Sequence, residues 1–439
     1  MSVSETLFVD VVETEEGFDQ LRSEWDRLFL RGGRSVFQSF EWQRAWWRHF
    51  GEGCVDRRLH LAVVRSAGDD IVGFAPCFIQ RVKAFGVVAV QRLAFLGRCI
   101  SDYLDVVAAD EQRVAVAQAF ARHIVDNAAT FDVCVLEDMS ARSSTANALR
   151  DELSSLGVQS ALFTNARCPR APLKHRWEDT LASLKAEHRR DIKLRRRTFE
   201  KRCAFELEIA GGATAIDADI EHVLALHRER STTTARTRTL DADTVERFHR
   251  EVARDLAARG WTFLAFLRVR GRRIAVLYGF CFNNELAVYL AGAHNAGELR
   301  QLSPGRVLTS LVMEHAVGCS LSAVDFMRGS EPYKYELGGV DVDNRTLVVP
   351  GARSRFSADK HRATLVSESL SCRVAEERGL WSQATAGARA LSVRSAMHLQ
   401  DRIGVLYRDG LATLRQGPQG DVGSVRNGSV FSPAPATSR

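Results

Sequence analysis

Apolar residues recur at helical spacing between positions 303 and 318. They lie three and four residues apart, at Val307, Leu308, Leu311 and Val312. Ser303 belongs to the residue types that cap helix N-termini, Pro304 suits the first helical position, and Gly318 suits the end. The pattern predicts a helix that begins at Ser303 and ends at Gly318, followed by a buried strand over residues 323–327.

Two regions of the chain repeat one order of elements. The segments that begin at Leu61 and Leu264 each predict a strand, a turn centred on Gly68 or Gly271, and a second strand. Each is followed by an expected strand, amphipathic helix and strand, at 103–107, 112–125 and 133–136 in the first region and at 286–291, 305–317 and 323–327 in the second. The repeat predicts an α/β (α+β) protein with two tandem domains of mixed sheet.

These patterns also suggest domain boundaries. We expect domains over residues 1–166 and 167–350, and a tail over 351–439. Apolar residues near helical spacing predict a docking or membrane-surface helix between about residues 384 and 415. From residue 416 onward, Gly, Pro and Ser predominate, and we expect disorder there.

The start of the 303–318 helix predicts an anion site. A helix N-terminus presents free N–H groups and about half a positive charge. Arg306 in the first turn opposes this dipole unless an anion such as a phosphate binds there. The plain alternative is a capped helix with a solvated Arg. In the first domain Asp110 and Glu111 stand at the equivalent place and would repel a phosphate, so we expect the cofactor in the second domain only.

Residues 183–202 form a strongly basic predicted helix, SLKAEHRRDIKLRRRTFEKR. Such a run is most often a solvated helix face. The functional alternative is a wall for a polyanion such as a nucleotide-sugar, a lipid pyrophosphate or tRNA. Aromatic residues are not interleaved with the charges, which weakens the case for nucleic acid.

Composition narrows the remaining classes. The formal net charge of +6 suits anionic ligands but is far from a polybasic balance. The nine cysteines are scattered and form no CxxC or CxxH pair, so we expect buried thiols and no metal site. The acidic N-terminus lacks the features of a secretory signal, and no apolar stretch approaches 18 residues. We expect a cytoplasmic protein, with contact at the inner face of the membrane as an option.

Five segments together resemble a known family. They are the SPGRVL loop, VDFMRGSEPYKY, the basic helix, RGWTFLAFLRVRGRRIAVLYGF and FQSFEWQRAWWRHFG. In this order they resemble the BcsL/CelD-type GNAT acyltransferases, relatives of the FemAB transferases, over roughly residues 30–350. The resemblance implies tandem GNAT folds and transfer of an acetyl or other acyl group from acyl-CoA. The acceptor would be an amine or hydroxyl of a cell-envelope precursor, such as one for cellulose or exopolysaccharide.

The resemblance also implies roles for individual residues. The strand 286–291, with Leu290 and Ala291, would pair with pantetheine, and the pyrophosphate would lie at Ser303, Pro304, Gly305 and Arg306. Candidate bases are His294, Asp325 and Glu331, and Tyr333 or Tyr335 would protonate the leaving thiolate. His294 stands where relatives commonly have Asp. For an anionic acceptor the expected residues are Arg195, Arg196, Arg328 and Lys334.

Two other functions fit the same sequence. One is a FemAB-like aminoacyl transferase whose donor is charged tRNA, with the basic helix as its docking surface. The other is a non-catalytic polysaccharide-assembly factor in which the acyl-CoA site has decayed. The partner would be a small-molecule or lipid-linked sugar acceptor, with tRNA as the second choice. The oligomeric state stays open.

Overall fold

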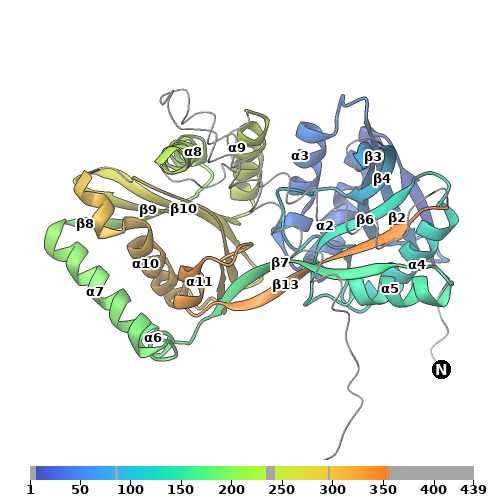
Figure 1. Ribbon diagram of the computed structural model, residues 1–439. Helices are drawn as coiled ribbons and strands as arrows, with labels where there is room; N and C mark the ends of the chain where they lie inside the picture. Colours follow the sequence, from blue (N-terminus) through green and yellow to red (C-terminus); the bar gives the residue numbers. More distant parts are fainter. Residues whose placement is uncertain (1–5, 85–87, 234–242, 295–296, 353, 355–439) are drawn as a thin grey trace, which may run out of the picture. The chain divides into compact units, whose positions relative to one another are not determined.

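The two predicted hairpins lie toward opposite ends of one mixed sheet in the computed structural model (Figure 1). The structure describes residues 6–84, 88–233, 243–294, 297–352 and 354. The strand order is β1-β2-β3-β4-β6-β13-β7-β12-β11-β10-β9-β8, with β5 paired to β3. The expected mixed α/β architecture, with one order of elements repeated in two halves, is confirmed. The segments expected to be helical or disordered beyond residue 384 lie outside the described residues.

The first half begins with a small strand and three helices. These are β1 (Phe8–Val12), α1 (Glu15–Gln20), α2 (Arg22–Gly32) and α3 (Phe40–Phe50), with the 3-10 helix η1 (Val36–Gln38) before α3. The sheet elements follow as β2 (Arg57–Arg65), β3 (Ile71–Ala84), β4 (Val88–Phe95), β5 (Val107–Ala108), α4 (Arg113–Asp126), β6 (Val133–Ser140) and α5 (Thr145–Ser155). Helices α4 and α5 pack side by side (Figure 1).

The second half repeats this order. Its elements are β7 (Ala161–Pro172), α6 (Trp177–Ala182), α7 (Ala186–Arg202), β8 (Phe205–Ala210), α8 (Ile216–Thr233), α9 (Asp243–Ala258), β9 (Thr262–Val269), β10 (Arg272–Phe282), β11 (Glu285–Ala293), η2 (Gly297–Leu302), α10 (Pro304–Gly318), β12 (Ala323–Asp325), α11 (Pro332–Glu336) and β13 (Val340–Pro350). The hairpin β9–β10, strand β11, helix α10 and strand β12 correspond to β2–β3, β4, α4 and β6. The internal repeat is therefore structural.

The two halves share strands in the middle of the sheet. Strand β13, from the end of the second half, pairs with β6 of the first half on one side and with β7 on the other. Strand β7 continues beyond β13 to pair with β12. The boundary expected at residue 166 therefore lies within β7, where the halves are joined by continuous backbone pairing.

Side-chain alternation on β10 separates two hydrophobic layers. Val276, Tyr278 and Phe280 join the larger core cluster with the apolar faces of α8 and α9. The intervening Ala275 and Leu277 join a second cluster with the apolar face of α10. The period of two in a strand produces this division. The larger cluster continues into the first half, where the Phe37 ring lies 6.1 Å from that of Phe280.

One predicted strand is wrong. Residues 103–107 were expected to match β11, but only Val107–Ala108 are strand, and they pair with β3. Tyr103 has a φ of 56°, in the left-handed region that ends an extended run. The sequence prediction also missed β4, which pairs with β3 up to Phe95. The chain thus leaves the sheet after β4, passes through residues 96–106, and returns to the edge of β3 as β5.

Candidate active site at the junction of the two halves

Strand β11 has a backbone edge that is only partly paired. Its parallel pairing with β12 covers Glu285 to Ala287 and ends opposite Asp325. The strand continues to Ala293 and stays paired with β10 on its other side. Among the described residues, no strand pairs with β11 beyond Ala287 on the β12 side. A strand edge without a partner strand is suited to an extended ligand that carries amide groups. Leu290 and Ala291, expected to bind the cofactor, lie on this stretch.

The start of α10 lies at the far end of that edge. Pro304 occupies the first helical position as predicted. Ser303 is the N-cap residue, but it has a φ of 51° and its side chain makes no capping hydrogen bond. A Cβ added to Gly305 would meet only the Cβ of Ala293, at 3.7 Å. The backbone at Gly305 is thus uncrowded next to the end of β11.

The expected set of free N–H groups at this helix start is smaller than predicted. Pro304 has none, and the N–H groups of Arg306 and Val307 both donate to the carbonyl of Ser303, at 2.9 and 3.2 Å. The N–H of Gly305 makes no hydrogen bond within the described part of the chain. An anion bound here would therefore depend in part on positively charged side chains.

Two arginines lie at the start of α10, and carboxylate groups pair with both. Arg306 pairs with Glu336 and lies 3.3 Å from Asp191. Arg195 donates to Asp191 at 2.7 Å and to the Ser303 hydroxyl at 3.1 Å. The unfavourable placement of Arg306 in the first turn is therefore offset by two acidic neighbours within the protein. Arg195, expected to bind the acceptor, instead lies against Ser303, in the loop expected to bind the cofactor.

Asp325 lies where β11 and β12 separate. It ends β12, and its side chain is 4% exposed. One carboxylate oxygen accepts from the Tyr103 hydroxyl at 2.7 Å, and the other accepts from the N–H of Met327 at 2.8 Å. Burial raises the pKa of Asp325 to about 7, although both hydrogen bonds favour the charged form. A carboxyl group that titrates near neutral pH suits a general base.

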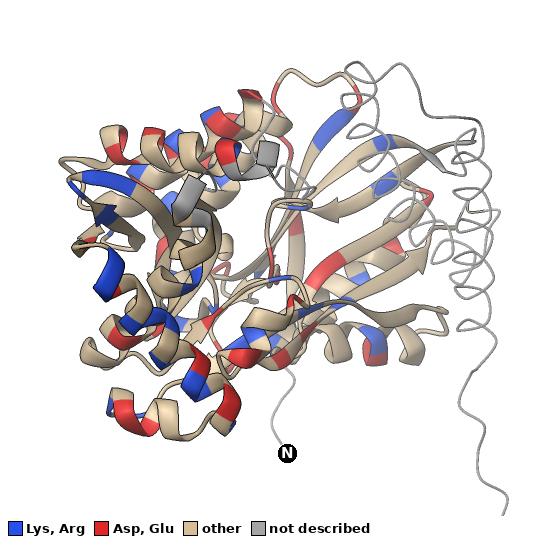
Figure 2. Cartoon of the chain, turned by 60° about the vertical axis from the view of Figure 1, so that its left-hand side comes forward, with Lys and Arg blue, Asp and Glu red and all other residues tan. Residues whose placement is uncertain are grey.

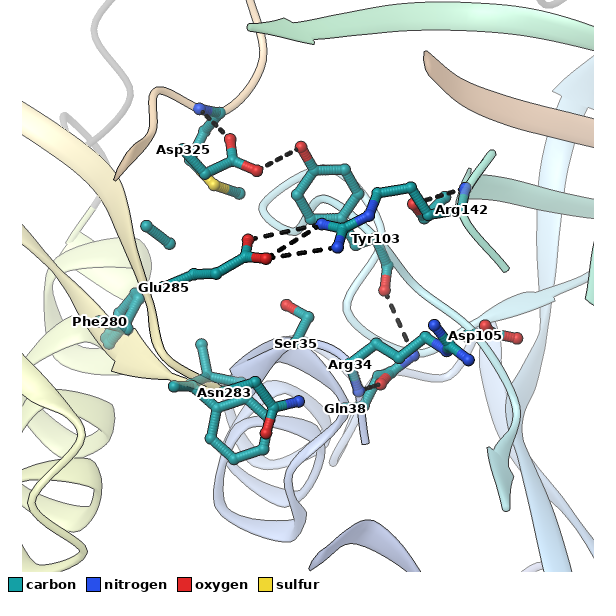
Figure 3. A pocket seen from close by; sticks show the side chains of 15 residues that line it. Arg34, Ser35, Gln38, Tyr103, Asp105, Arg142, Phe280, Asn283, Glu285 and Asp325 are labelled. Carbon is teal, nitrogen blue, oxygen red and sulfur yellow. Dashed lines mark hydrogen bonds and ion pairs between the residues drawn. The ribbon is translucent and has the colours of Figure 1, made fainter. Parts of the chain in front are cut away.

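A cavity of about 190 Å³ adjoins Asp325 between the two halves (Figure 3). The first half contributes residues around η1, the loop at Tyr103 and the end of β6, and the second half contributes the β10–β11 turn. The lining residues are Arg34, Ser35, Val36, Gln38, Tyr103, Asp105, Ser140, Arg142, Phe280, Phe282, Asn283, Glu285, Ala287, Asp325 and Met327. Amide, hydroxyl and charged groups thus face a small volume beside an aromatic wall, which is the composition of a ligand site.

Glu285 forms the charged part of this wall. Arg170 donates to both of its oxygens, at 2.7 and 2.9 Å, and Arg142 donates at 3.3 Å. Burial alone would raise the pKa of Glu285, but the hydrogen bonds and charge of Arg170 hold it below its usual value. Glu285 is therefore ionised near neutral pH, and its charge disfavours a second carboxylate at Asp325.

The other predicted bases and acids lie elsewhere. His294 follows β11 and pairs with Glu229 of α8 through Nδ1 at 2.5 Å. Glu331 lies 3.0 Å from Lys334 at the start of α11. The ring of Tyr333 packs 6.3 Å from Phe326. These three residues do not line the cavity. The structure therefore brings Asp325 alone of the predicted catalytic residues to the cavity wall.

The predicted substrate residues are largely occupied by protein contacts. Lys334 is 3% exposed, and its ammonium donates to the carbonyls of Met327, Arg328 and Gly329 at 2.7–3.2 Å. Arg196 pairs with Glu314 and covers the Trp177 ring. The geometry supports a role for Lys334 in holding the loop after β12.

Arg328 connects the halves. Its guanidinium lies 3.0 Å from Asp102 and 2.5 Å from Asp138, both in the first half. Asn344 of β13 also donates to Asp102, at 2.9 Å. This network holds Asp102, the residue before Tyr103, and so fixes the loop that carries Tyr103.

Basic residues of α7 divide into two sets. Arg195 and Arg196 face α10, whereas Arg190, Lys193, Arg197 and Lys201 are exposed. Over the helices in Figure 2, blue basic segments alternate with red acidic ones. The exposed set spaces its charges at three- and four-residue intervals, which places them on one side of α7.

Sequence reasoning missed the residues that the first half supplies. Tyr103 was assigned to a strand, and Arg34, Asp105 and Arg142 received no role. Only the acidic and aromatic SDYLD segment at 101–105 offered a signal, since polar residues within an apolar run often mark a site. These residues lie near Asp325 only because strands from the two halves pair in one sheet, β13 with β6 and β7 with β12.

Comparisons with known proteins identify a similar domain family and proteins of similar fold. Residues 186–335 match the family model described as acetyltransferase (GNAT) domain. No curated protein matches the sequence. The crystal structure of FemX has a TM-score of 0.51 at 10% identity, over 74% of this chain and 95% of FemX. A conserved protein of unknown function from Bacteroides thetaiotaomicron VPI-5482 has a TM-score of 0.49 at 12% identity, over 78% of this chain and all of that one.

A tandem GNAT protein from the clavulanic acid biosynthesis pathway has a TM-score of 0.42 at 12% identity, over 78% of this chain and 98% of that chain. At these identities the FemX comparison concerns the fold alone. Through the described part of the chain, no helix combines the length and apolar character needed to cross a bilayer. The BcsL/CelD subfamily stays a prediction. Residues 186–335 are thus similar to the acetyltransferase (GNAT) domain family, and the chain has a fold similar to that of FemX over 74% of its length.

Proposed function

We propose that this protein is an acyltransferase that moves an acetyl or other acyl group from acyl-CoA to an amine or hydroxyl held in the cavity between the halves. The observation that carries the proposal is the edge of β11 beyond Ala287, which has no partner strand on the β12 side among the described residues. This edge begins opposite Asp325 at the cavity wall and ends beside Gly305 at the start of α10. One continuous path thus leads from an anion site to a group suited to proton transfer.

The residues fit acyl-CoA along this path. The backbone of β11 beyond Ala287 would pair with the amides of pantetheine. Gly305, Arg306 and Arg195 would hold the pyrophosphate through one N–H and two guanidinium groups. The bound thioester would supply the acyl carbon. Asp191 and Glu336 would then share their arginine partners with the phosphates, because exposed ion pairs exchange at little cost.

The proposed reaction needs one proton acceptor. An acceptor amine gains a bond to the acyl carbon, the carbon–sulfur bond breaks, and the products are an amide and the free thiol. Asp325 takes the proton that the amine loses. The thiol sulfur must receive a proton in exchange, and the acid formed at Asp325 can return it through water. Orientation of the two substrates by the halves supplies the remaining advantage.

The finer description follows the resemblance. We infer an acceptor from cell-envelope or exopolysaccharide synthesis, as a small molecule or a lipid-linked sugar, and a reaction in the cytoplasm or at the inner face of the membrane. A second candidate donor is aminoacyl-tRNA. It is favoured by the exposed cations Arg190, Lys193, Arg197 and Lys201 on α7.

Calorimetry with acetyl-CoA tests the cofactor assignment. Arg306→Glu places a carboxylate between Asp191 and Glu336 at the phosphate site, and we expect affinity to fall by about tenfold to a hundredfold. Arg247→Glu makes the same change of charge on α9, where the arginine donates to Thr244, and should bind as the wild type does. Melting temperatures of both variants verify folding. Equal affinities in all three proteins would refute the site.

Thiol release with a panel of amines tests the base. Asp325→Asn should lower turnover by about 10²–10⁴ and leave acetyl-CoA affinity within about twofold. Asp341→Asn serves as the control, because Asp341 lies on β13, accepts from the Tyr335 hydroxyl at 2.7 Å, lies 3.8 Å from Arg167 and does not line the cavity. Unchanged turnover in Asp325→Asn would remove the base assignment while the calorimetric result stands.

A further inference from the structure

The first half differs from the second at the counterpart of β11. In the second half β11 runs without interruption from Glu285 to Ala293 toward α10. In the first half β4 ends at Phe95, one residue beyond its pairing with β6, and β5 resumes the edge of β3 at Val107. Residues 96–106 form an excursion between these two strands. The first half therefore lacks a counterpart of the β11 edge along which we propose that acyl-CoA binds.

The excursion occupies the equivalent space. Leu104 forms a parallel bridge with Met139 beyond the β4–β6 pairing. The excursion therefore extends the sheet at the place where β11 would leave an open edge. Its apex projects toward the second half and carries Tyr103 to Asp325.

Contacts on three sides hold Tyr103 in an unfavourable backbone conformation. Its φ of 56° is uncommon for a residue with a bulky side chain. Gln38 donates to its carbonyl at 3.4 Å, and the preceding Asp102 accepts from Arg328 and Asn344. Strained residues persist where the surroundings determine them, and they cluster at functional sites. The contacts fix the direction in which the Tyr103 hydroxyl points.

We propose that Tyr103 is a positioning residue for Asp325, so that the first half supplies part of the catalytic centre in place of a second cofactor site. This inference rests on the proposed function only in taking Asp325 as the base. The hydroxyl is 2.7 Å from one carboxylate oxygen, and the N–H of Met327 holds the other at 2.8 Å. Each oxygen keeps one lone pair, and one of them can receive a proton from an acceptor in the cavity.

Tyr103 donates and does not ionise. Burial and the nearby charge of Asp325 raise its pKa far above its usual value. A hydrogen bond to a carboxylate favours the ionised form. The other charged or titratable groups around Asp325 are Asp102 and Arg328 from the network between the halves, Glu285 of β11, and Cys168 and Arg170 of β7. Among these neighbours Tyr103 makes a side-chain hydrogen bond to the carboxylate, so removal of its hydroxyl acts on Asp325 directly.

The pH dependence of catalysis separates positioning from mere packing. Tyr103→Phe keeps the ring and removes the donor. We expect the acid limb of kcat/KM to shift upward by about one pH unit, which lowers efficiency about tenfold at pH 6 and less than threefold above pH 9. Glu251→Gln is the control, since Glu251 of α9 also links the halves, pairing with His49 of α3 at 2.8 Å, and does not line the cavity. Its acid limb should stay at the wild-type pH.

Direct titration of the carboxyl group makes the test independent of turnover. Carbon-13 NMR of protein labelled at the aspartate carboxyl carbons, with Asp325→Asn to assign the signal, reports the pKa of Asp325 without any substrate. It should be higher in Tyr103→Phe than in the wild type. Incorporation of 3-fluorotyrosine at position 103, a stronger donor in a nearly unchanged ring, should lower it and thus reverse the sign.

Two results would overturn the inference. One is an Asp325 titration that coincides in the wild type and in both Tyr103 variants. The other is an equal shift in Glu251→Gln, which would attribute the effect to docking of the halves. Failure of the proposed function has a different signature, because it would appear as absent acetyl-CoA binding or full turnover in Asp325→Asn while the carboxyl titrations still differ.

Discussion

Replacement of Arg328 by Met should destabilise the junction between the halves. The substitution keeps an unbranched apolar side chain and removes the guanidinium that contacts Asp102 at 3.0 Å and Asp138 at 2.5 Å. Asp102 would keep the amide of Asn344 at 2.9 Å, and Asp138 would keep the amide of Asn165 at 2.6 Å. Neither carboxylate would then face a cation of the second half within this network.

The expected size follows from the exposure of the partners. Their side chains are 9% and 5% exposed, so both carboxylates are nearly out of water, whereas 45% of the Arg328 side chain is accessible. Breaking a fully buried ion pair costs about 3–5 kcal/mol, and exposed pairs contribute less than about 1 kcal/mol. Water screens the accessible guanidinium, and the two amides remain. We therefore expect a loss of about 2–3 kcal/mol in the free energy of unfolding.

Urea unfolding at pH 8, followed by tryptophan fluorescence, measures this loss. Arg122→Met is the matched control, because the Arg122 side chain is equally exposed at 45% but faces the single carboxylate of Glu152. Its cost should stay below about 1 kcal/mol. Burial raises the pKa of Asp138 in the wild type, and loss of Arg328 removes an opposing charge. Protonation then relieves the unpaired charge, so the deficit of Arg328→Met should shrink as the pH is lowered toward 5.

An Arg328→Met variant no less stable than Arg122→Met would refute this reasoning. It would mean that the two carboxylates are solvated well enough without the guanidinium, and that the halves are held by the sheet and the shared apolar core alone. A deficit that grows as the pH falls would contradict the charge argument even if the total loss were of the expected size.

Two further predictions concern a buried histidine and the exposed cations of α7. His60 and His123 share a hydrogen bond of 3.0 Å between their Nε2 atoms, and burial lowers the pKa of His60 to about 4. Below about pH 6.5 the unfolded chain binds a proton at His60 that the folded protein excludes, so the stabilisation is complete above that pH and is lost toward pH 4. In urea titrations His60→Leu should therefore lose about 2 kcal/mol less unfolding free energy than the wild type between pH 7 and 5. Parallel stability–pH curves for the two proteins would contradict this. On α7, replacement of the exposed Lys193 and Arg197 by Gln should raise the KM for an anionic acceptor, most strongly at low salt, and leave acetyl-CoA affinity unchanged. Arg195→Gln should instead weaken acetyl-CoA binding, because Arg195 donates to the Ser303 hydroxyl. A KM that does not depend on ionic strength would mean that the exposed face of α7 is only solvated.

Much of the secondary structure follows from local pattern. The helix at 304–318 begins and ends where capping residues and apolar spacing place it. The hairpins β2–β3 and β9–β10 follow from alternating apolar residues around Gly-containing turns. These features depend on residues close together in the chain, so a single sequence contains the information needed to predict them. The α/β class and the internal repeat follow from the same evidence.

Long-range pairing decided what the sequence could not show. Residues 103–107 have the apolar alternation of a strand, yet tertiary contacts turn the chain at Tyr103, and the predicted pairing does not form. The predicted cations Arg195 and Lys334 were expected to face ligands, but a carboxylate four residues away and carbonyl groups five to seven residues away in the chain bind them first. Side-chain charge is visible in a sequence, whereas the partner that neutralises it is not.

The candidate active centre belongs to both kinds of information. The family resemblance implied Asp325 as one of three candidate bases, and local pattern placed it in a buried strand over residues 323–327. Its raised pKa, the cavity beside it and its bond to Tyr103 arise only when β13 crosses to β6 and β7 reaches β12. Desolvation and hydrogen bonding act over a few ångströms in space, and 222 positions of chain separate Tyr103 from Asp325. The sequence determined which groups are available, and the tertiary structure decided which of them share a proton.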